Sequence, residues 1–82
     1  PNNYTHYENA GICYYTAKDY KNAVIYFDKA IKFPTANTGK SEFFKAMSYI
    51  ALGNKSAGCS ALQAAKAKKY PGVDAQIAQY CK

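Results

Sequence analysis

The sequence predicts an all-α fold, and three observations lead to this expectation. Apolar and small residues recur with helical spacing, as in the stripe Tyr7, Ala10, Gly11 and Tyr14. The periodic segments end at breaks such as Gly53-Asn54, which favours a turn. No segment shows the alternation of apolar and polar residues that is typical of a strand. Five helices are therefore expected.

The expected helices span about 4–16, 19–32, 39–52, 55–69 and 73–81. Asn2, Asn3 and Thr5 are alternative caps for the first helix, because short polar side chains accept hydrogen bonds from unpaired backbone N–H groups. Asp19 suits the N-cap of the second helix and Thr38 that of the third. These caps mark the starts of the first three helices, and the breaks at Gly53-Asn54 and at Tyr70-Pro71-Gly72 separate the last three.

The length of 82 residues is sufficient for one small domain, residues 1–82, with a single modest core. The chain is 49% hydrophobic and 16% aromatic, which predicts a folded protein rather than a disordered one. No apolar run reaches the roughly twenty residues of a membrane span. The chain starts at Pro1 without a methionine, so we expect that it was processed or excised from a longer protein.

The charge of the chain is +6, and all of its basic residues except His6 are lysines. The lack of arginine disfavours specific recognition of nucleic acid, because arginine supplies the bidentate base contacts. Only Lys66, Lys68 and Lys69 form a dense basic patch. A solvated basic face is the favoured interpretation, and weak attraction to nucleic acid or anionic envelope polymers stays open as an alternative.

An internal repeat is the decisive feature for the architecture. Five residues recur 35 positions later with the same or a similar type: Gly11, Tyr14, Ala23, Phe27 and Ala30 return as Ala46, Tyr49, Gly58, Leu62 and Ala65. The chain is therefore expected to use one helix–turn–helix unit twice.

At these positions the sequence resembles the tetratricopeptide repeat (TPR) family, whose pattern has an aromatic residue, a Leu-Gly-type pair, Tyr, Ala, Phe and a final Pro. The first repeat, about 4–36, carries Tyr7, Ala10-Gly11, Tyr14, Tyr20, Ala23, Phe27, Ala30 and Pro34. The second repeat, about 38–71, keeps Ala46, Tyr49, Leu52-Gly53-Asn54, Gly58 and Ala65. Residues 72–82 resemble the helix that caps such arrays.

The resemblance implies a right-handed superhelix whose concave groove binds a peptide or a helix of another protein. The groove positions of the first repeat would be Thr5, Glu8, Asn9, Ile12 and Tyr15, and those of the second would be Lys40, Phe43, Phe44, Met47 and Ile50. An equally weighted alternative is that Phe43, Phe44 and Met47 belong to the core or to a contact with another repeat.

One subclass of the family clamps the C-terminal carboxylate of chaperones with lysine and asparagine side chains. The matching positions here hold Glu8, Ile12 and Phe44. Glu8 would repel a carboxylate, and the other two side chains cannot donate a hydrogen bond. The resemblance therefore does not extend to a carboxylate clamp.

Motifs for catalysis or cofactors are weak in this sequence. The segment from Pro34 to Ser41 partly matches a phosphate-binding loop, but Pro34 replaces its first glycine and no strand precedes it. His6 has no partner residues that suggest a catalytic dyad or a zinc site. We therefore expect no enzyme activity, no metal and no cofactor.

The cysteines suggest a bond between the last two helices. If these helices fold back at Pro71-Gly72, Cys59 and Cys81 lie roughly 16 and 14 Å from the turn at the rise of an α-helix. A disulfide and two buried thiols are then equally weighted. Cys13 is interpreted as a small core residue.

The sequence thus favours a non-enzymatic interaction scaffold with a protein or peptide partner. The alternatives are the basic surface module and a purely structural end cap of a longer repeat array. A periplasmic, cell-envelope or secreted location is expected if Cys59 and Cys81 are bridged, and a cytoplasmic location fits the reduced form.

Overall fold

The computed structural model describes residues 3–81, and these form five α-helices without any strand. The helices are α1 (Tyr4–Thr16), α2 (Tyr20–Ile31), α3 (Lys40–Ala51), α4 (Lys55–Ala67) and α5 (Val73–Tyr80). The predicted all-α class is confirmed. The largest difference from the expected bounds is the end of α4, which stops before Lys69 because that residue adopts a left-handed backbone with φ of 62°.

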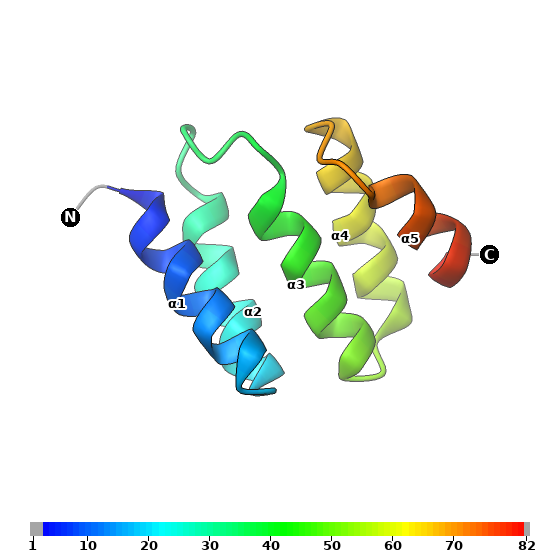
Figure 1. The fold of residues 1–82 in the computed structure, drawn as a ribbon, viewed down its shortest axis with the longest axis horizontal. Coiled ribbons are helices and arrows are strands. Elements are labelled where there is room, and N and C mark those ends of the chain that lie inside the picture. Colours follow the sequence, from blue (N-terminus) through cyan, green and yellow to red (C-terminus); the bar gives the residue numbers. More distant parts are fainter. Residues whose placement is uncertain (1–2, 82) are drawn as a thin grey trace.

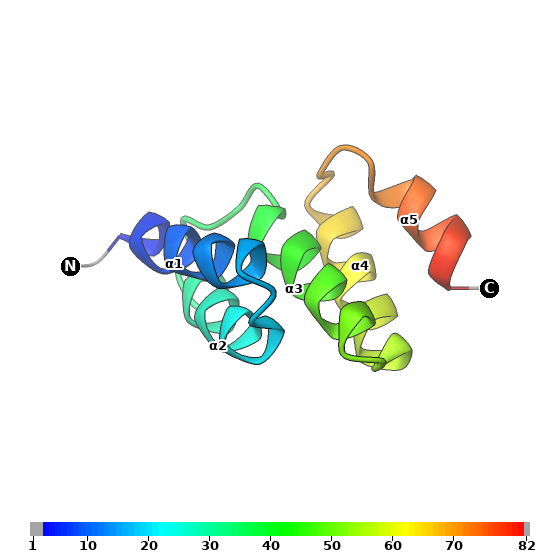
Figure 2. The ribbon, with the colours of Figure 1, turned by 60° about the horizontal axis from the view of Figure 1, so that its bottom comes forward.

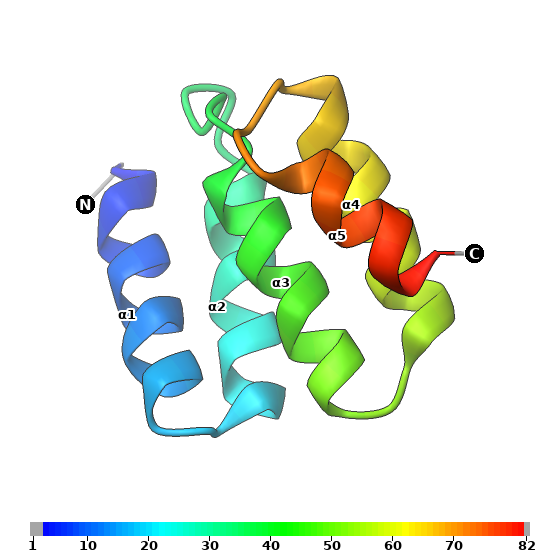
Figure 3. The same cartoon turned by 45° about the vertical axis from the view of Figure 1, so that its right-hand side comes forward.

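The five helices follow one another along the long axis of the molecule, which measures 39 × 25 × 16 Å (Figure 1). Helices α1 and α2 form one helical hairpin and α3 and α4 form a second, and each helix contacts the next one in the chain. Turning the molecule shows the two hairpins side by side with α5 beyond α4 (Figure 2), and α5 lies in front of α4 when the right-hand side comes forward (Figure 3). The N- and C-terminal ends of the described chain are therefore far apart.

Three helices begin at the polar residues that cap their backbone N–H groups. The Asn3 side chain accepts a hydrogen bond from the Thr5 amide at 2.9 Å, so Asn3 caps α1. Asp19 and Asn54 cap α2 and α4 in the same way. At α3 the N-cap is Gly39 rather than the expected Thr38, but the Thr38 hydroxyl still accepts a hydrogen bond from the Lys40 amide at 3.2 Å. The alternative cap Asn2 lies outside the described residues, as do Pro1 and Lys82.

The turns inside the two hairpins repeat the same geometry 35 residues apart. The Asp19 amide donates to the Tyr14 carbonyl at 2.8 Å, and the Asn54 amide donates to the Tyr49 carbonyl at 2.9 Å. The left-handed residue before each N-cap is Lys18 in the first turn and Gly53 in the second, with φ of 65° and 85°. The backbone thus repeats in register with the sequence, which supports a repeat-like helical fold.

Each hairpin has one glycine at which the other helix packs too closely for a side chain. A Cβ atom on Gly11 would lie 2.7 Å from the Phe27 ring, and one on Gly58 would lie 2.6 Å from Ile50 and 3.1 Å from the Ala46 carbonyl. Both distances are too short for a side chain. Gly11 is on the first helix of its hairpin, whereas Gly58 is on the second helix of its hairpin. Both hairpins therefore have a close contact at a glycine, but the glycine is on a different helix in each.

The core runs along the seams between neighbouring helices. Phe27 and Leu62 occupy equivalent positions in α2 and α4, and neither is accessible to solvent. Small residues surround them, since Ala23, Ala30, Ala46 and Ala65 are also fully buried. Large side chains packed between alanines explain how two short helices approach closely enough to exclude water.

Helix α5 covers the end of the second hairpin and is joined to it by a disulfide. The bond links Cys59 to Cys81, whose Cα atoms lie 5.6 Å apart, so of the two alternatives the bridge is the one observed. Val73 adds an apolar contact and is 2% exposed. The interpretation of Cys13 as a core residue is wrong, because its thiol is free and exposed on α1.

No helix within residues 3–81 is both long enough and apolar enough to cross a membrane.

Candidate functional site

Glu8, which was predicted to line a groove, lies instead in the contact between α1 and α3. Its side chain is 8% exposed, and its Oε2 accepts a hydrogen bond of 2.8 Å from the Ser41 hydroxyl. A buried polar pair of this kind fixes how two helices meet, because either group alone would lose its hydrogen bonds to water. Glu8 therefore joins the two hairpins and offers no charge to a ligand.

Phe43 and Phe44 are half-buried and take part in aromatic contacts between elements. The ring of Phe44 lies 5.3 Å from that of Tyr15 and 6.2 Å from that of Phe27, which links α3 to both helices of the first hairpin. Phe43 packs on Tyr70, with ring centroids 5.0 Å apart. These distances are typical of stabilising aromatic pairs. Both residues thus contribute to the packing of the fold, which is the second of the two alternatives that the sequence left open.

Tyr15 borders the same aromatic contacts from α1. Burial raises the pKa of its phenol above the ordinary value of 10.0, and the nearby phenols of Tyr20 and Tyr80 raise the pKa further. Each of these neighbours would repel a phenolate at Tyr15. Tyr15 therefore stays neutral at physiological pH and acts as an apolar and hydrogen-bonding surface rather than as a charge.

Of the predicted groove residues other than Glu8 that lie outside these aromatic contacts, Thr5 is exposed at the start of α1 and Ile50 packs against the core. The other four are here called the α1–α3 face. It consists of Asn9, Ile12, Lys40 and Met47. Asn9 is exposed and the other three are half-buried. Ile12 and Met47 are equivalent residues 35 positions apart on helices that contact each other. The face thus pairs two apolar side chains with one amide and one ammonium group.

The dense lysine patch is largely occupied by ion pairs. Lys66 pairs with Asp74 at 3.2 Å, and Lys68 pairs with Glu42. The Lys68 ammonium group also donates to the carbonyl of Ala36 at 2.8 Å. Two of the three lysines therefore already have an acidic partner, which leaves little free positive charge for an anionic polymer.

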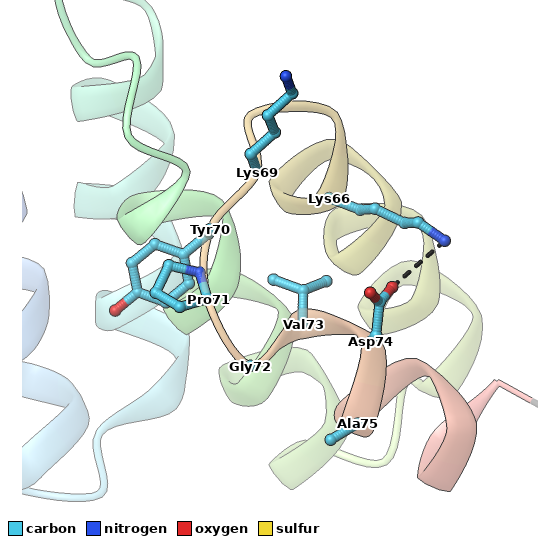
Figure 4. A pocket seen from close by; sticks show the side chains of 8 residues that line it. All are labelled: Lys66, Lys69, Tyr70, Pro71, Gly72, Val73, Asp74 and Ala75. Atoms are coloured by element: carbon cyan, nitrogen blue, oxygen red, sulfur yellow. Dashed lines mark ion pairs between the residues drawn. The ribbon is translucent and has the colours of Figure 1, made fainter.

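A shallow hollow of about 390 Å³ lies where α4 turns into α5 (Figure 4). Tyr70, Pro71 and Val73 line one part of it, and the Lys66–Asp74 ion pair closes one side. The first turn of α5 contains Asp74, whose negative charge interacts favourably with the positive end of the helix dipole. Lys66 and Asp74 therefore already have partners within the chain, and we do not interpret this hollow as a ligand site.

A second hollow, here called the Tyr49 hollow, has a volume of about 370 Å³ and lies between α3 and α4. Small side chains of α4 form most of its wall, and its lining consists of Lys45, Tyr49, Ala57, Ser60, Ala61 and Ala64. This hollow was not predicted from the sequence. The signal that points to it is the 35-residue repeat, because Tyr26 and Lys29 of the first hairpin become Ala61 and Ala64 in the second.

The segment that partly matches a phosphate-binding loop has another role in the structure. A Cβ atom on Gly39 would lie 3.0 Å from the Cβ of Tyr70 and 3.1 Å from the carbonyl of Ala65. Gly39 is buried against the end of α4. The backbone at Gly39, the one glycine of the partial motif, is therefore covered by protein and cannot approach a phosphate.

The titratable residues between 3 and 81 do not gather into a metal site, since no group of three or more His, Cys, Asp or Glu side chains lies close together there. The most isolated polar atom is Oε1 of Glu42, which is buried and has no hydrogen-bond partner. Its other oxygen pairs with Lys68. This arrangement serves to hold α3 and α4 together and supplies no nucleophile or base to a cleft.

Comparison with known proteins found no matching family model, no similar curated protein and no similar solved structure.

Proposed function

We propose that this chain is a non-enzymatic interaction module of the TPR type, which binds a peptide or helix of another protein on the α1–α3 face. The observation that carries the proposal is that Ile12 and Met47 occupy the same position in two repeated units and that both are only half-buried. Repeat proteins use such equivalent positions of successive units to build one extended binding surface.

The chemistry of the α1–α3 face suits a short segment with both apolar and acidic residues. Ile12 and Met47 offer an apolar contact, and methionine adapts well to different side chains. Lys40 lies at the start of α3, where it would attract an acidic residue of the ligand, and Asn9 can donate to or accept from a ligand backbone. Glu8 does not oppose this, because its carboxylate is engaged with Ser41.

A peptide selection tests the proposal. Peptides displayed on phage are selected on the wild-type protein and then measured against Met47→Ala, Ile12→Ala and the control Ile25→Ala on α2, where the side chain is 49% exposed. We expect each of the first two variants to weaken binding by about 5- to 10-fold, the typical cost of truncating a central contact, and Ile25→Ala to change little. Peptides that bind all four proteins equally, or a selection that yields no binders, would contradict the proposal.

We also propose that the protein works in an oxidising compartment such as a periplasm, a cell envelope or the exterior. The Cys59–Cys81 disulfide supports this, because such bonds persist outside the reducing cytosol. Protein extracted under conditions that block free thiols should carry one blocked cysteine, Cys13, by mass spectrometry. Three blocked cysteines would place the protein in a reducing compartment instead.

A further inference from the structure

The two hairpins treat one equivalent space in different ways. In the first hairpin, the ring of Tyr26 stacks on Tyr14 with centroids 5.2 Å apart and an angle of 21° between the planes. The residues that correspond to Tyr14 and Tyr26 in the second hairpin are Tyr49 and Ala61. The ring of Tyr14 is therefore kept as that of Tyr49, while the ring of Tyr26 is replaced by the methyl group of Ala61.

The Tyr49 hollow is the space that this replacement leaves open. Ala61 and Ala64 line it, and they stand where the first hairpin has Tyr26 and Lys29. Alanine side chains at both positions leave the face of the Tyr49 ring without the neighbour that Tyr14 has. Ser60 and Ala64 are exposed, so the hollow opens to the surface and another molecule can reach it.

A cation is already placed beside the retained ring. In the first hairpin the Lys29 ammonium group lies 5.0 Å from the centroid of the Tyr26 ring. In the second hairpin Lys45 supplies an ammonium group 5.8 Å from the centroid of Tyr49. Lys45 is held in place by an ion pair with Asp28 of α2. An aromatic ring that entered the hollow would thus meet both a stacking partner and a cation.

From this comparison we infer that the Tyr49 hollow is a second docking site, which receives one aromatic side chain of a partner protein. The first hairpin shows the chemistry of the occupant, since a tyrosine of the chain itself fills the equivalent space there. The volume of about 370 Å³ accommodates one such side chain. This inference is independent of the α1–α3 face, because none of the residues that line the hollow belongs to that face.

A blocked amino acid serves as the probe. N-acetyl-tyrosinamide is titrated into the protein, and the methyl signals of Ala57, Ala61 and Ala64 are followed by NMR. We expect saturable upfield shifts from the ring current of the bound probe, with a Kd of roughly 1–10 mM, because one side chain presents few atoms for binding. N-acetyl-leucinamide should give shifts at least threefold smaller at the same concentration.

Two variants decide the question. Ala61→Tyr places the residue of the first hairpin into the second and should abolish the shifts at Ala57 and Ala64, whereas Gln63→Tyr adds the same residue to an exposed site on α4 and should not. If Ala61→Tyr does not fold by circular dichroism, Tyr49→Leu replaces it, because this variant removes the stacking partner. Absent shifts, equal shifts with N-acetyl-leucinamide, or shifts that persist in the variants would each overturn the inference. Met47→Ala should leave the shifts unchanged, which separates this site from the proposed peptide face.

Discussion

In the first hairpin the rings of Tyr7 and Phe33 stack with centroids 5.9 Å apart, whereas the equivalent residues of the second hairpin, Glu42 and Lys68, form an ion pair. The backbones around these two contacts repeat 35 residues apart, so the positions are equivalent and only the chemistry differs. The same contact between the two helices of a hairpin can therefore be made by two stacked rings or by an ion pair.

The two solutions differ in what they connect. The aromatic pair joins α1 to the end of α2, within one hairpin. The ion pair has a further bond, because the Lys68 ammonium group also donates to the carbonyl of Ala36 in the segment between the hairpins. It has a cost as well, since Oε1 of Glu42 is buried without a partner. The second hairpin thus contains one unsatisfied polar atom, Oε1 of Glu42, but its Lys68 also contacts the segment that follows the first hairpin.

The largest expected effect tests whether the two hairpins depend on equivalent core residues. Phe27→Ala should lower the free energy of unfolding by about 4 kcal/mol and Leu62→Ala by about 3 kcal/mol, because each removes a fully buried side chain and leaves a cavity. Urea unfolding followed by circular dichroism measures both. Ile25→Ala is the control, with an expected change below about 0.5 kcal/mol at an exposed site. A loss below about 1 kcal/mol for one core variant alone would show that its hairpin is loosely packed.

The next effect concerns the covalent bond, which only the second hairpin has. Cys59→Ser combined with Cys81→Ser should lower stability by about 3 kcal/mol, because the bond closes a loop with a sequence separation of 22 and so restricts the unfolded chain. Cys13→Ser is the matched control and should change little, since that thiol is exposed and free. Equal stability of the double variant and the wild type would mean that α5 is held by Val73 and its neighbours alone.

The smallest effect separates the ion pair from the aromatic pair. Lys68→Met should cost about 2 kcal/mol, because it leaves the buried Glu42 carboxylate and the Ala36 carbonyl without their donor. Adding Glu42→Leu should recover most of this loss, since two apolar side chains then meet as they do between Tyr7 and Phe33. Thermal unfolding of both variants gives the comparison. A double variant as unstable as the single one would show that the Ala36 bond, rather than the charge, matters.

Much of this fold could be predicted from the sequence because its signals are local. Asn3 and Asp19 cap the helices that they were expected to cap, since a cap depends only on a side chain and the next few amides. Asn54 was expected only as part of a turn, and the structure shows that it also caps α4. The similar distances of Cys59 and Cys81 from one turn made their bond one of two equally weighted expectations, and the structure shows the bond. Such features need no knowledge of how the hairpins pack against each other.

The errors concern residues whose surroundings come from distant parts of the chain. Glu8 was expected in a groove on the basis of the family resemblance, but its side chain is buried and accepts a hydrogen bond from the Ser41 hydroxyl, 33 residues away. Cys13 is apolar and sits beside Tyr14, but the face of α1 that carries it has no neighbour among the described residues. The Tyr49 hollow arises from what Ala61 lacks, and only alignment of the two repeats reveals an absent ring.

The disulfide also determines how the molecule would respond to mechanical load. The bond joins Cys81, just after α5, to Cys59 within α4. A pulling force applied at the C-terminal end of the chain would pass through this bond directly into α4, so α5 and the turn before it would lie outside the path of the force. Tension between the two ends of the chain would therefore act on the segment from α1 to Cys59, while the rest of α4 and helix α5 would carry none of it.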